Sequence, residues 1–116
     1  LYAAKTYAMD EWRKQVNAPI AVYDSNVYSS NGKSEIAITI RNVSYKTVKA
    51  FRMQFVCYDV FGRTEVREQE YYVENTWLMS AESNTYFWDK YSTGIEYISN
   101  PIITQVVYSD NTSWYK

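Results

Sequence analysis

The stretch of residues 47–62, TVKAFRMQFVCYDVFG, most constrains the fold of this chain. Apolar side chains occupy every second position from Phe51 to Cys57, so they point to one side of an extended strand. The residues between them are of mixed polarity, as on a sheet face that is only partly covered. Gly62 closes the stretch with the backbone freedom that a tight turn needs. The pattern predicts a long central strand over residues 47–60 of an antiparallel sheet.

Further stretches have the composition of strands, with turn residues between them. The clearest is residues 34–43, in which Ile36, Ile38 and Ile40 alternate with polar or small residues. The remaining strands are predicted at residues 20–28, 63–74, 85–88, 102–109 and 112–115. The charged side chains of the second of these are typical of an edge strand, where they discourage pairing with another chain. About seven strands at this spacing predict an all-β fold, an antiparallel β-sandwich of immunoglobulin-like type.

Residues 1–18 are the only helical candidate. Alanine and methionine favour a helix there, and Tyr2 and Trp12 belong to an irregular apolar stripe. Pro19 stops this helix, because the residue before a proline avoids the helical region. We therefore expect a short N-terminal helix at residues 1–18 and a β-sandwich domain at residues 19–116. The favoured interpretation is that the helix packs on the sandwich, since its aromatic rings would otherwise be exposed; the alternative is that it ends a linker.

The composition argues against enzymatic chemistry and against nucleic-acid binding. The chain has no histidine, so it lacks the commonest general base and the commonest zinc ligand. Its single cysteine, Cys57, cannot form an internal disulfide and is predicted to fill the core. The net charge is -1 and the charges are scattered, which leaves no basic patch for nucleic acid. We expect no catalytic residue, no metal and no cofactor, and, because no apolar run approaches ~20 residues, no membrane-spanning segment.

Oxygen-bearing side chains offer two further kinds of candidate site. A glycosidase needs a pair of carboxylates, and the predicted edge strand offers Glu65, Glu68, Glu70 and Glu74. The favoured interpretation is that these are solvated residues of a polar strand. Acidic and amide side chains also occur in turns, near Asp24, Asp89 and Asp110. No loop offers the roughly 6 to 8 oxygens that calcium needs, so turn formation explains them.

Aromatic residues are abundant, with 13 Tyr, 4 Trp and 4 Phe. Those that crowd one region, beside the predicted loop 75–84, are Trp77, Tyr86, Trp88 and Tyr91. Exposed rings of this kind could hold a sugar or a peptide, because a flat ring offers a large contact area at low conformational cost. The favoured interpretation is that the rings pack in the core or at its rim. These residues are nonetheless the candidate ligand-binding residues of the chain.

Residues 55–59, FVCYD, followed by Gly62, resemble the motif of FxLYD-type domains, with Cys57 where that family usually has Leu. Residues 42–48 resemble the entry into the same strand, and residues 106–114 are similar to the closing hairpin of related Firmicutes domains of unknown function. The Pro-Gly turn expected before the later strands is absent. The resemblance implies a small β-sandwich module of a bacterial extracellular protein or lipoprotein, in a Gram-positive cell, without catalytic residues.

These features lead to three hypotheses of different kinds. The first is a non-catalytic extracellular or cell-surface accessory module, which acts as a spacer, a docking domain or a protein-interaction domain. The second is a carbohydrate- or peptide-binding module that uses the crowded aromatic residues. The partner is an unknown protein or a glycan in either case. A glycosidase that uses the edge-strand glutamates is the third and least favoured hypothesis.

Overall fold

The computed structural model describes residues 18–30, 33–64, 69–90 and 95–116, which form nine strands and no helix. The strands are β1 Ile20–Ser30, β2 Lys33–Asn42, β3 Val48–Phe55, β4 Cys57–Tyr58, β5 Gln69–Val73, β6 Ser83–Lys90, β7 Tyr97–Ile98, β8 Ile102–Tyr108 and β9 Ser113–Tyr115. Their pairings are antiparallel. The all-β prediction is confirmed for these ranges, which also hold no helix that could cross a membrane. The helix predicted at residues 1–18 falls, apart from Ala18, outside the described residues.

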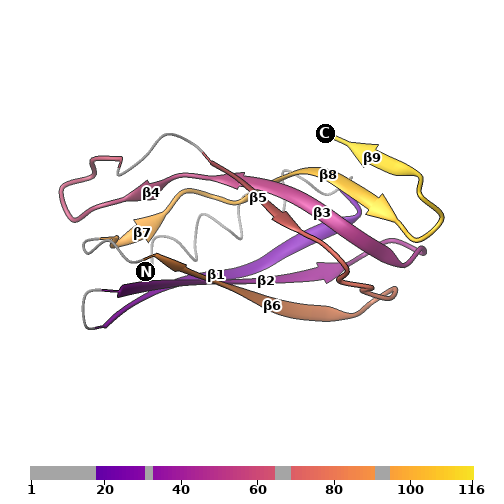
Figure 1. Ribbon diagram of the computed structural model, residues 1–116, viewed down its shortest axis with the longest axis horizontal. Helices are drawn as coiled ribbons and strands as arrows, with labels where there is room; N and C mark the ends of the chain where they lie inside the picture. Colours follow the sequence, from indigo (N-terminus) through magenta and orange to yellow (C-terminus); the bar gives the residue numbers. More distant parts are fainter. Residues whose placement is uncertain (1–17, 31–32, 65–68, 91–94) are drawn as a thin grey trace.

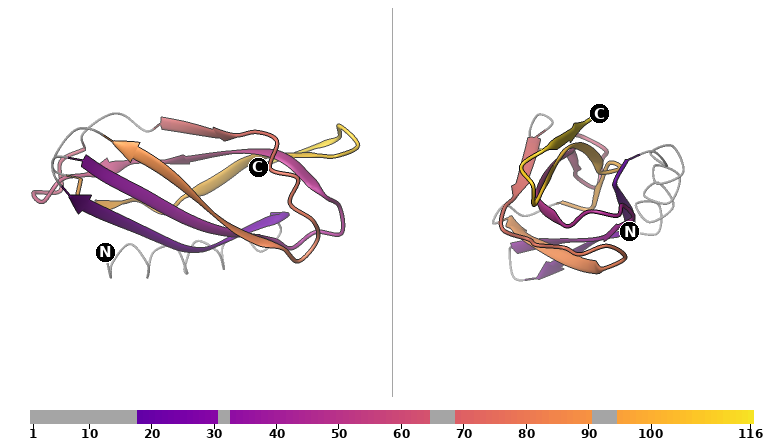
Figure 2. Two further views of the ribbon diagram at one scale, coloured as in Figure 1. Left: turned by 60° about the horizontal axis from the view of Figure 1, so that its bottom comes forward. Right: turned by 90° about the vertical axis from the view of Figure 1, so that its right-hand side faces the viewer.

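The strands form two larger sheets and a short ribbon (Figure 1). One sheet, the β2 sheet, has the order β1-β2-β6, and the other, the β3 sheet, has the order β5-β3-β8-β9. The ribbon consists of β4 and β7. The two larger sheets lie as two layers (Figure 2), and side chains from both form one hydrophobic core. The fold is therefore sandwich-like, with the core between its layers.

The alternation predicted for residues 34–43 is confirmed in β2 except at Ala37, which is buried although it lies on the opposite face from the isoleucines. Ile36, Ile38 and Ile40 are each 0% exposed and belong to the core. Glu35 and Thr39, which lie between or beside them, are partly exposed. Because β2 lies between β1 and β6, its backbone is paired on both sides. Such a strand buries one face without leaving an open edge.

The prediction of one continuous strand over residues 47–60 is wrong. β3 ends at Phe55, and β4 begins at Cys57 and pairs with β7, outside the β3 sheet. At the break, the Val56 N–H donates to the Ser99 hydroxyl at 2.8 Å, and the Val56 carbonyl accepts from the Ser99 N–H at 2.8 Å. The burial alternation runs through the break unchanged, since Phe55 and Cys57 are both buried. The position of β3 is as predicted, because it lies inside its sheet between β5 and β8.

Other strand boundaries also differ from the prediction. The charged stretch 63–74 supplies an edge strand, β5, which is described from Gln69 onward, and Thr64 forms a single bridge with Tyr58. The strand predicted at residues 85–88 extends over the whole of β6. The ribbon strand β7 is not predicted, because a strand of two residues has no period to detect.

A buried asparagine ties the β2–β3 turn to the loop that precedes β6. Asn42 is 0% exposed. Its Nδ2 donates to the carbonyls of Lys46 at 2.8 Å and Leu78 at 2.9 Å. Its Oδ1 accepts from the Ser44 N–H at 2.9 Å and the Ser44 hydroxyl at 2.7 Å. Both amide hydrogens and the carbonyl oxygen of the side chain are therefore used, as a buried polar group requires.

Phe55 joins the two layers at the centre of the core. Its ring stacks on Tyr71 of β5, with centroids 4.0 Å apart and planes at 4°. It also meets Trp88 of β6 edge-on, with centroids 6.2 Å apart. Burial raises the pKa of the Tyr71 hydroxyl, so this side chain stays neutral. Aromatic pairs of this kind contribute stability beyond the area that they bury.

We predict that Phe55→Ala lowers the free energy of unfolding by about 3 to 5 kcal/mol, because it leaves a large cavity between the layers. The measurement is urea denaturation of the wild type and the variant. Phe61→Ala is the matched control, since Phe61 is 79% exposed and its loss should change stability by no more than about 0.5 kcal/mol. A similar loss in both variants would show that Phe55 does not face the core.

We also predict that Asn42→Ala costs about 2 to 4 kcal/mol, because the carbonyls of Lys46 and Leu78 each lose one donor and the Ser44 N–H and hydroxyl lose their acceptor. Asn84→Ala serves as the control, since Asn84 is exposed on β6. Amide hydrogen exchange adds a local readout, because the N–H of Leu78 should exchange faster in the Asn42 variant. An unchanged exchange rate of the Leu78 N–H would contradict the proposed role of Asn42 in holding this loop.

Candidate functional site

The structure separates the aromatic residues that the sequence groups together. Trp77 is 51% exposed, in the loop between β5 and β6. Tyr86 and Trp88 lie on β6, are partly buried and pack against the core. Tyr91 lies outside the described residues. Of the three that are described, Trp77 alone is exposed, and ligand binding by this group stays a prediction.

The contacts of the two β6 aromatics are those of packing residues. Tyr86 lies edge-on to Phe51 with ring centroids 5.4 Å apart, and its hydroxyl is hydrogen bonded to the Thr76 hydroxyl. Trp88 lies edge-on to Tyr71 with centroids 5.6 Å apart. Both rings therefore bridge from β6 to the β3 sheet or to the loop that follows β5.

A different row of side chains crosses the outer face of the β3 sheet. Tyr72 of β5 is opposite Arg52 of β3, Arg52 is opposite Gln105 of β8, and Gln105 is opposite Tyr115 of β9. We call these residues the tyrosine row. Each tyrosine is 62% exposed, and the Gln105 Nε2 donates to the Tyr115 hydroxyl at 3.1 Å. With three strand spacings between them, the two tyrosines stand about 14 Å apart.

Glu70 fixes the β5 end of the tyrosine row. The Tyr72 hydroxyl donates to Glu70 Oε2 at 2.7 Å, and Gln54 Nε2 donates to Glu70 Oε1 at 2.9 Å. Arg52 Nη1 lies 3.5 Å from Glu70 Oε2. The hydrogen bonds from Tyr72 and Gln54, together with the Arg52 charge, hold the pKa of Glu70 below its usual range. The carboxylate therefore stays ionised and keeps the Tyr72 ring in one orientation.

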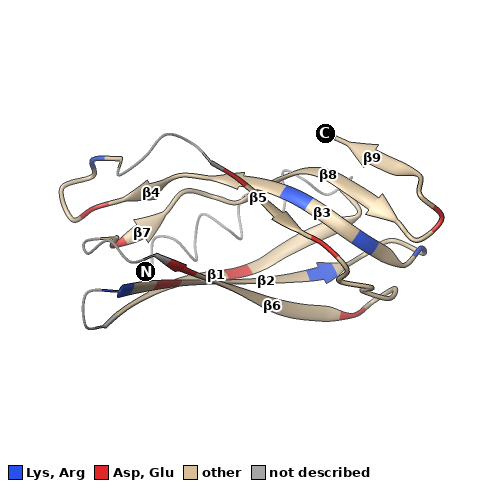
Figure 3. Ribbon diagram, viewed as in Figure 1, with Lys and Arg blue, Asp and Glu red and all other residues tan. Residues whose placement is uncertain are grey.

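A shallow hollow of about 160 Å³ lies between the strands of this face. Its lining includes the small residue Ala50 together with Arg52, Tyr72, Gln105 and Val107. A short side chain among longer neighbours leaves this space open. Lysine and arginine residues are interspersed with acidic ones over the strands of the molecule (Figure 3). The outer face of the β3 sheet therefore carries no large field of one sign.

The glutamates considered for glycoside hydrolysis are only partly described. Glu65 and Glu68 lie outside the described residues. Glu70 is held in the tyrosine row as above, and Glu74 lines the hollow. Within the described ranges, no group of three or more His, Cys, Asp or Glu residues is placed to hold a metal ion.

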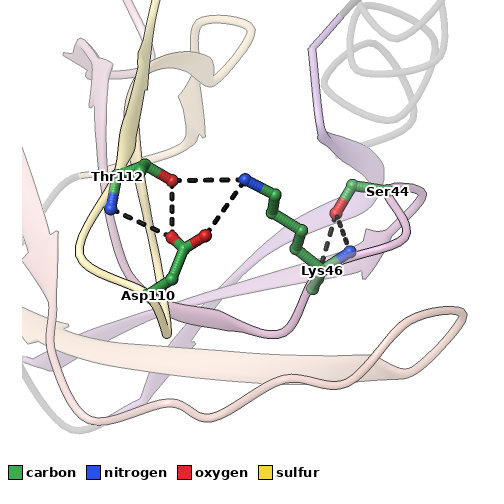
Figure 4. A network of polar contacts seen from close by, with 4 residues as sticks. All are labelled: Ser44, Lys46, Asp110 and Thr112. Atoms are coloured by element: carbon green, nitrogen blue, oxygen red, sulfur yellow. Dashed lines mark hydrogen bonds and ion pairs between the residues drawn. The ribbon is translucent and has the colours of Figure 1, made fainter.

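The hairpin that carries Tyr115 is tied to the β2–β3 turn by a polar network (Figure 4). Lys46 Nζ lies 3.2 Å from Asp110 Oδ2 and 3.4 Å from the Thr112 hydroxyl. Asp110 Oδ1 accepts from the Thr112 N–H at 3.0 Å and from the Thr112 hydroxyl at 2.5 Å. The ammonium of Lys46 also lies 5.0 Å from the centroid of the Tyr108 ring. The hairpin turn predicted at Asp110 is thus confirmed, and its network positions β9 beside β8.

The sequence does not predict the tyrosine row, because its members come from different strands. Tyr72, Arg52 and Gln105 do carry one local signal, since each follows or precedes a buried neighbour, and Tyr115 follows the partly buried Trp114. That signal assigns a side chain to the outer face. It does not say which strands are adjacent, and the register of four strands is needed to bring the row together.

Comparisons with known proteins leave the family of this chain open. No family model matches the sequence, and no curated protein matches it either. A solved structure with a similar arrangement is the crystal structure of a DUF1425 family member from Shewanella sp. pv-4. It has 12% sequence identity and a TM-score of 0.48, over 72% of this chain and 73% of that chain. The resemblance to FxLYD-type domains therefore stays a prediction.

We predict that part of the stability of the protein is lost as the pH falls from about 4 to about 2. The hydrogen bonds from Thr112, and then the Lys46 ammonium, lower the pKa of Asp110 to about 2. A depressed carboxyl pKa stabilises the folded state above the unfolded value, and this contribution disappears as pH falls through the folded value. Urea denaturation at several pH values measures the effect.

Asp110→Asn should therefore be less stable than the wild type at pH 5, with a difference that shrinks toward pH 2. Lys46→Met is the informative comparison, because it keeps the Thr112 hydrogen bonds, which are the larger cause of the shift. It should retain most of the pH dependence. The same acid dependence in the wild type and in Asp110→Asn would contradict the assignment.

Proposed function

We propose that this chain is a non-catalytic extracellular or cell-surface accessory module that docks a protein partner on the tyrosine row. The observation that carries the proposal is the register of Tyr72, Arg52, Gln105 and Tyr115 across the outer face of the β3 sheet. The hydrogen bonds among these side chains and Glu70 support it, because they orient the face before any partner arrives.

The chemistry of the row is that of a protein interface. Tyrosine and arginine are enriched where binding energy concentrates, because each offers a large contact area together with hydrogen bonds. Tyrosine also loses little conformational entropy when it is fixed. Tyr72 and Tyr115 each expose most of the side chain, and about 14 Å between them suits a contact made at two points.

The order of the strands supports an immunoglobulin-like form of the sandwich. In such folds, strands A, B and E share one sheet and strands C, F and G share the other. β1-β2-β6 corresponds to the first group and β3-β8-β9 to the second. β5 lies at the free edge beside β3, on the sheet to which variable-type domains add strands C′ and C″.

The extracellular setting rests on the resemblance of residues 55–59 and Gly62 to the FxLYD motif. Cys57 is the single cysteine of the chain and is buried, which fits a module that folds without disulfides. The chain also lacks histidine, which supports a role without acid–base chemistry. Secretion can be read from the full-length gene, where a signal peptide ahead of this segment would agree with the proposal and its absence would oppose it.

The alternative, a carbohydrate- or peptide-binding module, is favoured by one observation at Trp77. Its ring is 51% exposed and its backbone is left-handed, with φ 44°, a conformation that bulky residues rarely adopt. The neighbouring residues are anchored, since the Thr76 N–H donates to the Lys49 carbonyl at 2.9 Å, and Leu78 forms a bridge with Val48. A strained, anchored and exposed tryptophan is a reasonable second contact point.

The proposal predicts where a partner crosslinks. A photo-crosslinking amino acid is placed at single positions of the full-length protein in the cells that produce it. Crosslinked adducts should form at Tyr72 and Tyr115 and be weak at Tyr28 and Tyr45, which are 54% and 101% exposed elsewhere on the surface. The measurement is the yield of the shifted band at each position.

Equal yields at all four positions would contradict docking on the tyrosine row. A fifth probe at Trp77 that forms adducts when the other four do not would favour the alternative module. Turnover of a glycoside, ester or peptide substrate that disappears in Glu70→Gln would contradict the non-catalytic role.

A further inference from the structure

The ribbon of β4 and β7 brings two tyrosines together at one end of the sandwich (Figure 1). Tyr58 is opposite Tyr97, and their rings lie 4.9 Å apart between centroids with planes at 11°. The adjacent pair, Cys57 and Ile98, is buried at 1% and 0% exposure. Since neighbours on a strand point to opposite faces, the two tyrosines lie on the side of the ribbon away from the core.

A cleft of about 330 Å³ opens beside this tyrosine pair. It is lined by Tyr58, Tyr97, Ile98, Ser99 and Asn100. The volume lies within the range of small-ligand sites, which is about 300 to 1,000 Å³. The backbone pairing of Ser99 with Val56 at 2.8 Å holds the segment that forms one wall. None of the lining residues carries a charge, so the cleft offers little to an ion.

Asn100 brings a polar side chain to the lining of the cleft. Its Oδ1 atom is buried and has no hydrogen-bond partner in the described part of the chain. Such an atom costs about 1 to 3 kcal/mol when nothing donates to it. Buried polar atoms without a partner are rare in folded proteins and call for an explanation. Because Asn100 lines the cleft, a rotation of its side-chain amide would bring this oxygen to the cleft, where a donor on a bound molecule could satisfy it.

We propose that this cleft binds one neutral sugar ring of a glycan. The apolar C–H face of the ring would lie against the tyrosine pair, and a hydroxyl or acetamido N–H on its rim would donate to Asn100 Oδ1. An aromatic surface with a few well-placed polar groups and no charge suits this class of ligand. The site is separate from the tyrosine row and does not depend on the proposed docking function.

The test is a nitrogen-15 NMR titration of the whole chain with methyl β-D-glucopyranoside and, in parallel, N-acetyl-D-glucosamine. At least one of these sugars should cause saturable shifts of the amides of Tyr58, Tyr97 and Asn100, together with the Asn100 side-chain NH₂. A ring of this size should bind with a Kd in the millimolar range. Glucuronate, which is anionic, should bind more weakly than methyl glucoside.

Substitutions assign the roles of the lining residues. Asn100→Leu removes the acceptor and should weaken binding about tenfold. Tyr58→Leu removes half of the aromatic surface and should weaken it about fivefold. Tyr45→Leu is the matched control and should leave the Kd unchanged, because Tyr45 is fully exposed outside the cleft. The dispersion of the NMR spectrum verifies that each variant is folded.

Three results would overturn the proposal. The first is the lack of a saturable shift with either neutral sugar. The second is a set of shifts confined to the tyrosine row or to Trp77. The third is unchanged affinity in folded Asn100→Leu and Tyr58→Leu, which would leave a cleft that holds water only.

Discussion

The packing of Phe55 between the two layers is the contact on which the rest of the structure depends. Phe55 stacks on Tyr71 in its own sheet and meets Trp88 of the opposite sheet edge-on. Neighbouring residues of a strand point to opposite faces, so burying Tyr71 turns Tyr72 outward. The same rule turns Arg52 outward between two buried residues of β3. The tyrosine row is thus the reverse side of the core, and whatever stabilises the core also orients the row.

The alternation alone would leave the row free to shift along the strands, and polar contacts at the strand ends limit such movement. Asn42 joins the β2–β3 turn to the carbonyl of Leu78 in the β5–β6 loop. Lys46, in the same turn, reaches Asp110 in the β8–β9 hairpin. The buried amide contact is the stronger restraint, because the ion pair is exposed and screened by solvent. Together they tie three connections of the sandwich at one end.

The sequence predicts the fold class and the core more completely than it predicts the candidate site. Ile36, Ile38 and Ile40 predict a buried face because their period is local. The break at Val56 escapes prediction, since the same alternation continues from Phe55 into the next sheet. Functional surfaces are harder still, because they are assembled from strands that are distant in sequence. Aromatic residues that are close in sequence therefore need not share a surface, since Trp88 of β6 packs toward the core while Trp77 is exposed in the preceding loop.

The break at Val56 has a consequence beyond the boundary of a strand. If β3 continued in its own sheet, Tyr58 would have an ordinary place on the outer face of that sheet. Because the chain leaves at Val56 and pairs with β7, Tyr58 instead meets Tyr97. The same departure brings Ser99 and Asn100 beside the ring pair, where they line the cleft. The residues that resemble a family motif thus also build one wall of a small cavity, and Asn100, whose buried Oδ1 has no partner among the described residues, lies in its lining.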